Sequence, residues 1–233
     1  SLYGKYRREN KKDFQDWAER TESTFNWFRI PNVFGPFCRP NYNSFIATFC
    51  HKIINNEEVD LIENGTDIPI IYVDNLCDQI MSFVEETPSQ KGLTIMPDVS
   101  VTVTDIYQRL RMYKSVYIDQ QIIPMLANIN DSNLFNTFRS YISDKDRVVT
   151  TKMFIDDRGS IGETIKTLHQ GRSFFSTTKP GQVRGNHFHI RKLERFCVLK
   201  GKAKIDLRKL NTSEVISYEL DGEKTQYLSL IHI

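Results

Sequence analysis

The sequence predicts two domains of different class, an α/β domain followed by an all-β domain. The chain has 233 residues, which leaves room for two compact units. Through residue 143 apolar residues recur mostly at helical spacing, with short β-prone runs between them. Beyond that point, short β-prone runs follow one another with turn residues between them. The polar stretch 144–146 separates the two patterns, so we expect domains at residues 1–143 and 147–233.

The first domain is predicted to alternate helices with strands. Phe14, Trp17 and Ala18 follow the i, i+3, i+4 rule of an amphipathic helix. The same spacing predicts helices near 44–54, 76–83 and 105–117. Runs bounded by turn residues predict strands at 24–30 and 68–73. Helices alternating with short buried strands favour a parallel sheet.

The second domain is predicted to consist of strands. The β-prone runs cover residues 148–155, 162–168, 172–178, 187–190, 196–200 and 202–207. Turn residues separate them, for example Asp156, Asp157, Arg158 and Gly159. Many short strands with regular turns are typical of a sandwich or a barrel.

Composition excludes several classes of function. The formal net charge of +2 is too small for a basic nucleic-acid surface, so no nucleic-acid partner is expected. No apolar run approaches the roughly 20 residues that a membrane-spanning helix needs, so no membrane partner is expected. The four cysteines are far apart and show neither zinc-ribbon nor disulfide-scaffold spacing. We therefore expect a reduced, cytoplasmic environment.

A group of candidate metal ligands lies in the second domain. His187 and His189 are two residues apart, so in one strand their side chains would share a face. Glu194 follows five residues later and could return on the next strand toward the same interior. Two imidazoles and one carboxylate can form an open site for a divalent metal. An isolated pair of histidines is more often a surface or hydrogen-bonded pair, so the surrounding spacing decides.

The spacing of Gly181, His187, His189, Glu194 and Gly201 resembles the first metal motif of the cupin superfamily at every position. This resemblance implies a jelly-roll barrel in which His187, His189 and Glu194 bind Zn²⁺ or another divalent metal. The second cupin motif, P-x-G-x-x-H, is absent, and His232 lacks the preceding Pro and Gly. We therefore expect a cupin jelly-roll that is truncated at its C-terminal end.

The flanks of this motif resemble those of nucleotide-sugar epimerase and isomerase cupins. Asp156, Arg158, Gly159 and Glu163 match their D-x-R-G opening, and Arg184 precedes His187 as in their R-G-x-H strand. The resemblance implies that Arg158 and Arg184 bind an acidic or phosphate group, a role that suits guanidinium. They could equally be solvated or paired residues at the end of the barrel. In metal-free sugar epimerases the equivalent of His187 is the catalytic base, so ligand and base remain two possible roles for His187.

The first domain resembles the C-terminal half of an extended short-chain reductase, a Rossmann-type fold. Its motifs are Y-x-x-x-R at Tyr3 and Arg7, R-I-P-N-V-F-G-P at 29–36 and Y-V-D-N at 72–75. The resemblance implies that Tyr3 transfers a proton at the reacting carbonyl and that Tyr3, Arg7, Pro31 and Asn32 contact NADPH. Arg7 stands where that family has lysine, and it keeps the positive charge without the compact ammonium.

The phosphate-binding turn G-x-x-G-x-x-G occurs nowhere in the sequence. Together with the start at Ser1 and the missing second cupin motif, this leads us to expect an internal fragment of a longer enzyme.

The union of the two sets of motifs, with residues 32–51, resembles the CapF family of bifunctional capsular-polysaccharide enzymes. The resemblance implies a UDP-4-keto-6-deoxy-N-acetylhexosamine substrate, epimerisation at C3, reduction at C4 by NADPH, zinc and a homodimer. Asn32, Arg39 and Asn41 would contact the substrate. For Arg39 and Asn41 the alternative is a turn that caps the helix near 44–54, since Asn41 and Asn43 are natural helix caps.

Two other functions remain open at this stage. A metal-dependent cupin of another class, such as an oxygenase, would carry the same three ligands. A non-catalytic sugar-binding or dimerising module would keep the fold without the chemistry.

Because the phosphate-binding turn is absent, we expect no NADPH oxidation by this chain alone when a UDP-4-keto sugar is supplied. An absorbance assay of NADPH measures it. Steady turnover by the purified chain would contradict the prediction.

Overall fold

The structure is a computed structural model, and it describes residues 2–61, 65–86, 92–189, 193–224 and 226–230. Contacts divide the chain into two compact units, which are described separately. The first unit comprises Ser1–Ile155 and Ser160–Thr177, and the second comprises Asp156–Gly159 and Thr178–Ile233. The domain boundary expected at 144–146 coincides with the short 3-10 helix η2 (Asp144–Asp146) inside the first unit. That boundary stays a prediction.

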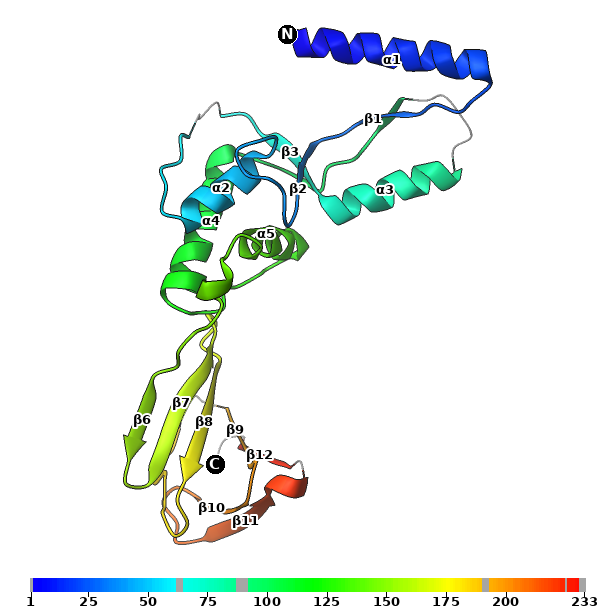
Figure 1. Cartoon of the computed structure of the whole chain (residues 1–233). Coiled ribbons are helices and arrows are strands. Elements are labelled where there is room, and N and C mark those ends of the chain that lie inside the picture. Colours follow the sequence, from blue (N-terminus) through cyan, green and yellow to red (C-terminus); the bar gives the residue numbers. More distant parts are fainter. Residues whose placement is uncertain (1, 62–64, 87–91, 190–192, 225, 231–233) are drawn as a thin grey trace. The chain divides into compact units, whose positions relative to one another are not determined.

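The order of elements is helix-rich first and strand-rich afterwards, as the sequence predicts (Figure 1). None of the described helices has the length and apolar character that a bilayer crossing requires. The elements up to η2 are α1 (Leu2–Thr21), β1 (Trp27–Arg29), β2 (Asn32–Phe34), α2 (Phe45–Ile54), β3 (Ile68–Tyr72), α3 (Val73–Glu86), β4 (Gly92–Thr94), β5 (Val99–Val101), α4 (Val103–Tyr113), η1 (Lys114–Asp119) and α5 (Ile129–Arg139). Those after η2 are β6 (Met153–Asp156), β7 (Gly159–Lys166), β8 (Arg172–Thr178), β9 (Glu194–Cys197), β10 (Lys202–Arg208), β11 (Val215–Asp221), η3 (Gly222–Lys224) and β12 (Tyr227–Leu230).

The expected parallel pairing is present in two places. β1 pairs in parallel with β4, and β2 pairs in parallel with β3. β3 also pairs with β5, but antiparallel, so the described strands form a mixed three-stranded sheet beside a two-stranded one. The α/β character of this part is therefore confirmed, while a complete Rossmann-type sheet stays a prediction.

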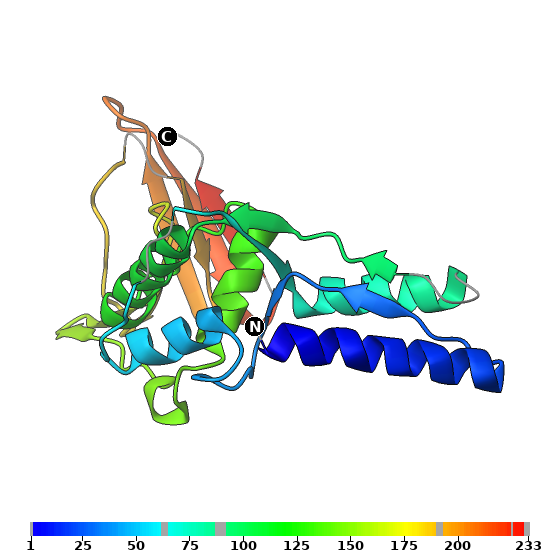
Figure 2. The same ribbon diagram turned by 90° about the horizontal axis from the view of Figure 1, so that it is seen from above.

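The helix α1 lies against β1 through aromatic and cationic contacts. Phe14 stacks on Phe25 with ring centroids 5.7 Å apart, and Lys11 Nζ lies 3.7 Å from the centroid of the Trp27 ring. A cation placed over the face of an indole is attracted by the ring quadrupole. Figure 2 shows α1, in dark blue, running alongside the β1 strand.

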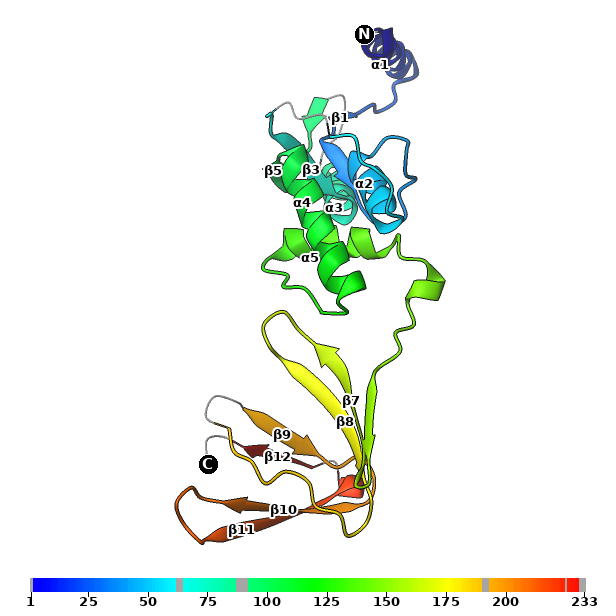
Figure 3. The ribbon, with the colours of Figure 1, turned by 90° about the vertical axis from the view of Figure 1, so that its left-hand side faces the viewer.

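The main core of the first unit lies where α2, α4 and α5 meet (Figure 3). Tyr113 and Phe138 are fully buried, and Tyr113 contacts Phe135 edge-to-face with centroids 5.1 Å apart. The Tyr113 hydroxyl donates a hydrogen bond to the carbonyl of Asp131, at 3.2 Å. Burial raises the pKa of Tyr113 to about 12, so this hydroxyl stays protonated and remains a donor.

The helix ends differ from the sequence expectation in two respects. The N-cap of α2 is Ser44, whose hydroxyl accepts from Ala47 N at 3.3 Å, so Asn41 and Asn43 do not cap this helix. The helix expected at 105–117 is α4, which ends at Tyr113 and continues as the π-helix η1. The π-helical segment is only 6 residues long, so the apolar spacing is too short a record to reveal the change of hydrogen-bond register.

The helix α5 was not predicted. Its buried face includes polar side chains, among them Asp131, Asn133 and Thr137, so apolar spacing does not mark it. The carboxylate of Asp131 pairs with Arg109, and the Thr137 hydroxyl donates to the carbonyl of Asn133 at 2.9 Å. Asp131 and Thr137 can therefore be buried at low cost, because each has a partner.

The strand-rich part agrees with the sequence in most elements. β8 has the bounds that were expected, and β6, β7, β9 and β10 overlap the expected strands. β11 and β12 were missed. The strand expected at 187–190 is wrong over residues 187–189, which form no strand, and Ile190 lies outside the described residues.

The described strands of the second unit form two antiparallel ribbons. β10 pairs with β11 and β9 pairs with β12. At the end of the first ribbon, Gly222 N donates to Gly201 O at 2.9 Å, and a Cβ on Gly222 would lie 2.7 Å from Lys200 N. Only glycine allows this approach of the two backbones. The all-β class is confirmed, and the closed jelly-roll stays a prediction.

Replacement of Phe138 by alanine should destabilise the first unit strongly. The side chain is fully buried between aromatic neighbours, so Phe138→Ala leaves a cavity and should lower the free energy of unfolding by about 3–5 kcal/mol. Phe37→Ala, at a side chain that is 85% exposed, is the matched control and should change it by less than about 0.5 kcal/mol. Urea unfolding followed by circular dichroism measures both, and equal losses would contradict the core assignment.

Candidate functional site

Three side chains of the predicted metal site meet in the second unit. His187, His189 and Glu194 each offer a ligand atom, and these atoms all lie within 4.8 Å of one another. His189 Nε2 is 3.1 Å from Glu194 Oε1, and the two imidazole rings have centroids 4.8 Å apart. His187 is exposed, while His189 and Glu194 are half-buried. The sequence prediction that these three residues come together is confirmed by the geometry.

The two histidines reach Glu194 from a loop. Gly181, Gly185 and Asn186 have positive φ angles of 78°, 99° and 61°. Backbone in this left-handed region cannot continue a strand, and glycine or asparagine adopts it most readily. The turns end directly before His187, and Glu194 is the first residue of β9. The donors therefore converge between a turning loop and a strand end.

The donor set suits a divalent metal ion. In a tetrahedral zinc site with ligand bonds of about 2.0–2.1 Å, neighbouring donor atoms are about 3.3 Å apart. The His189–Glu194 separation of 3.1 Å is close to this value, and the limit of 4.8 Å for the whole set needs only small side-chain adjustments. Three protein ligands leave a coordination position for water or substrate.

The two predicted arginines are joined by one carboxylate. Arg158 Nη2 and Nε lie 2.6 and 3.0 Å from Asp156 Oδ2, and Arg184 Nη2 lies 3.3 Å from Asp156 Oδ1. The hydrogen bond from the Arg158 side chain is the main reason that the pKa of Asp156 is lowered. Asp156 is therefore ionised at neutral pH, and it is the residue of this group whose role the sequence did not suggest.

The loop that carries Arg39 and Asn41 is held by two helices. Asn41 N donates to the hydroxyl of Thr48 on α2, at 2.9 Å. Tyr141, after α5, donates its hydroxyl to the carbonyl of Cys38 at 2.5 Å. The Arg39 guanidinium lies 5.7 Å from the centroid of the Tyr42 ring. Arg39 and Asn41 themselves are exposed, so this loop has a fixed backbone and outward polar side chains.

The residues predicted to contact the nicotinamide cofactor lie on two elements of the first unit. Tyr3 and Arg7 are one turn apart on α1, and the Arg7 side chain is exposed. Pro31 directly precedes β2, and Asn32 is its first residue. Asn32 Nδ2 lies 3.5 Å from the carbonyl of Pro69 in the neighbouring strand β3. Their roles stay predictions.

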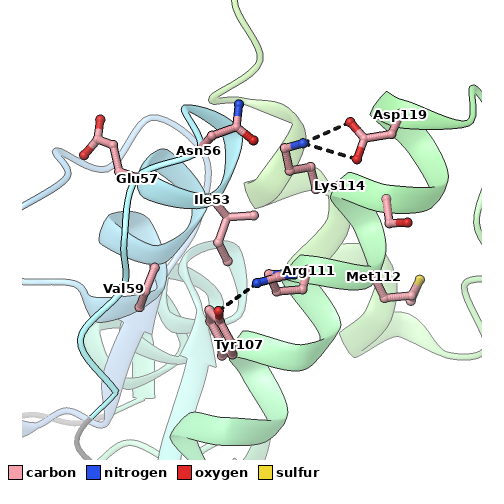
Figure 4. A pocket seen from close by; sticks show the side chains of 10 residues that line it. Ile53, Asn56, Glu57, Val59, Tyr107, Arg111, Met112, Lys114 and Asp119 are labelled. Atoms are coloured by element: carbon pink, nitrogen blue, oxygen red, sulfur yellow. Dashed lines mark hydrogen bonds and ion pairs between the residues drawn. The ribbon is translucent and has the colours of Figure 1, made fainter.

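A separate cavity of about 550 Å³ lies in the first unit between the end of α2 and the α4–η1 helix (Figure 4). Its cationic groups already have partners, because Lys114 pairs with Asp119 at 2.9 Å and Arg111 donates to the Tyr107 hydroxyl at 3.1 Å. The described lining includes none of the residues predicted for the site. Cavity volume alone therefore does not locate the chemistry of this chain.

Comparison with known proteins shows one consistent relationship. Residues 154–233 match the family described as "Polysaccharide biosynthesis C-terminal domain". The structure matches capsular polysaccharide assembling protein CapF from Staphylococcus aureus with a TM-score of 0.85 and 34% identity. This match covers 99% of this chain and 63% of the CapF chain.

The chain resembles CapF. A crystal structure of CapF with the inhibitor 3-isopropenyl-tropolone matches with a TM-score of 0.81 and 35% identity, over 94% of this chain and 65% of that one. UDP-2-acetamido-2,6-beta-L-arabino-hexul-4-ose reductase of Pseudomonas aeruginosa is 28% identical over 230 residues, which is 98% of this chain and 62% of that relative. The chain thus spans less than two thirds of the CapF-like proteins that it matches, and the resemblance runs through both of its units.

Proposed function

We propose that this chain is part of a nucleotide-sugar enzyme of capsular polysaccharide synthesis. Its strand-rich part would epimerise C3 of a UDP-4-keto-6-deoxy-N-acetylhexosamine. Its α/β part would contribute to reduction of C4 by NADPH, giving a UDP-6-deoxy-L-talosamine. The observation that carries the proposal is the cluster of His187, His189 and Glu194 within 4.8 Å, in a chain that resembles CapF along nearly its full length.

The order of the two steps follows from carbonyl chemistry. The proton on C3 is acidic only while C4 is a ketone, because the enolate spreads its charge onto the C4 oxygen. Reduction of C4 removes that acidity, so epimerisation has to come first. An enzyme for this sequence needs a base at C3, a group that stabilises the enolate oxygen and a hydride donor.

The second unit would supply the base at C3 and the group that stabilises the enolate oxygen. His187, His189 and Glu194 would hold a divalent ion, and such an ion supplies Lewis-acid polarisation of an oxygen when bound. His187 is the most exposed of the three, and its ring nitrogen would either complete the ligand set or accept the C3 proton. Arg158 and Arg184 carry positive charge for the acidic groups of the nucleotide.

The first unit would serve the reduction. Tyr3 would transfer the proton to the C4 oxygen, and Arg7, one turn further along α1, would supply the positive charge that favours the tyrosinate form. Pro31 and Asn32 would contact NADPH, and Asn32, Arg39 and Asn41 would contact the substrate. The fixed backbone of the loop around Arg39 supports this role, because its polar side chains point outward from a rigid frame.

The proposal includes a homodimer. Apolar side chains of the second unit are exposed on its strands, including Phe196 on β9, Ile216 on β11 and Tyr227 on β12. Exposed apolar side chains such as these can be covered by a second chain. This supports association of two chains.

The chain should bind one divalent metal ion through the three clustered residues. Titration with Co²⁺, followed by its visible absorbance, should saturate at one ion per chain. His189→Ala should weaken binding at least about tenfold because it removes one of three protein ligands. His169→Ala, at an exposed histidine in a turn outside the cluster, is the matched control and should bind like the wild type. Equal affinity of the His189 and His169 variants would contradict the assignment.

The epimerase half of the proposal is tested by proton exchange. In deuterated water, the full-length protein that contains this chain should introduce deuterium at C3 of the UDP-4-keto sugar, which mass spectrometry and NMR detect. His187→Ala should abolish uptake, and His169→Ala should not. The metal content of the His187 variant then separates a lost ligand from a lost base. If the full-length wild-type protein exchanges no proton at C3, the epimerase function is wrong.

A further inference from the structure

One carboxylate in the second unit receives donors from two distant segments. Asp156 Oδ2 accepts from Nη2 and Nε of Arg158, at 2.6 and 3.0 Å. Asp156 Oδ1 accepts from the backbone N–H of Arg158 at 2.9 Å and from Arg184 Nη2 at 3.3 Å. Both oxygens are thus occupied, and each contributes to holding a guanidinium group.

The position of the carboxylate itself is set by the local backbone. The hydrogen bond from Arg158 N to Asp156 Oδ1 closes a short turn of the type that aspartate forms with the residue two positions later. Gly159, with φ 138°, completes the reversal of the chain into β7. The carboxylate is therefore oriented before either guanidinium binds it.

The second guanidinium comes from the loop that leads to the histidines. Arg184 lies three residues before His187, among the turns at Gly181, Gly185 and Asn186. A backbone hydrogen bond from Lys179 N to Arg158 O, at 2.9 Å, joins the same loop to the same turn. Asp156 thus contributes to a two-point attachment between the 156–159 turn and the loop that carries two of the three clustered donors.

The network is stronger than an isolated surface pair. Single exposed ion pairs contribute little to stability, and exposed fractions of 41% for the Asp156 side chain and 48% for Arg158 place them at the surface. Here, however, one carboxylate accepts four donors, and Arg184 is only 24% exposed. Charge-assisted hydrogen bonds that share an acceptor restrict both long side chains at once.

We propose that Asp156 is a positioning residue that holds the guanidinium groups of Arg158 and Arg184 next to each other as one receptor for a doubly charged acidic group. The inference rests on the proposed function, which assigns the two arginines to acidic groups of the nucleotide sugar. Two guanidinium groups repel each other, and the carboxylate between them offsets that repulsion. Because both arginine side chains are already held in place, binding of the acidic group costs less side-chain entropy. The contact with Asp156 uses Nε and Nη2 of Arg158, and Nη1 lies outside it.

Substitutions at Asp156 and at its neighbour Asp157 distinguish positioning of the arginines from a general effect of removing one negative charge. The probe is inorganic pyrophosphate, titrated calorimetrically into the purified chain in EDTA so that no metal ion competes for it. Asp156→Asn should raise the Kd about tenfold, because the amide loses the charge-assisted contacts. Asp157→Asn removes the same charge one residue away and should leave the Kd unchanged or lower it slightly. Asp156→Glu keeps the charge but moves the carboxylate by one methylene, and it should also weaken binding.

A second measurement follows Arg158 directly. In NMR spectra of the free chain, the Nε–H signal of Arg158, which donates to Asp156 Oδ2 at 3.0 Å, should be protected from solvent exchange. This signal should lose that protection in Asp156→Asn and keep it in Asp157→Asn.

The outcomes are distinct from those of the epimerase test. If Asp156→Asn binds pyrophosphate as tightly as Asp157→Asn, or more tightly, Asp156 does not position the arginines and the inference is wrong. If the wild-type chain does not bind pyrophosphate, the receptor does not exist and the inference is also wrong. Failure of deuterium exchange at C3 with intact pyrophosphate binding would instead overturn the proposed reaction and leave the receptor in place.

Discussion

The short contact between His189 and Glu194 is the interaction on which the candidate site depends. A half-buried carboxylate at 3.1 Å from an imidazole nitrogen needs either a proton or a metal ion between them, since two lone pairs at that distance repel. His187 adds a second imidazole within 4.8 Å, which an ion pair alone does not require. The three donors converge because the turns at Gly185 and Asn186 bring the histidines to the strand end.

The two units are stabilised by different kinds of interaction. The first has a densely aromatic core around Tyr113 and Phe138, and that core gives its surface loop a rigid support through Tyr141. The second has few buried side chains among its described residues, Leu220 on β11 being one, so polar networks set much of its local geometry. Asp156, with its four donors, is the clearest example.

Prediction from the sequence succeeded where a local rule governs the structure. Helical spacing identified α2, α3 and α4, and alternation with turn residues identified β8 to its ends. Ligand type and spacing predicted that His187, His189 and Glu194 would come together, and they do, although the predicted strand for the two histidines was wrong. Their role as ligands stays a prediction. Prediction failed at α5, where the buried face contains polar groups, and at η1, where the hydrogen-bond register changes over only 6 residues.

The sequence by itself determined the two classes of structure, the metal-type donor set and the resemblance to CapF, because residue type and spacing are written in the chain. Only the tertiary structure decided which polar groups share a partner. Asp156 and Arg184 are 28 residues apart, and no periodic rule connects them. Their contact exists because the loop before His187 turns back onto the 156–159 turn, and such long-range pairing depends on how the whole backbone folds.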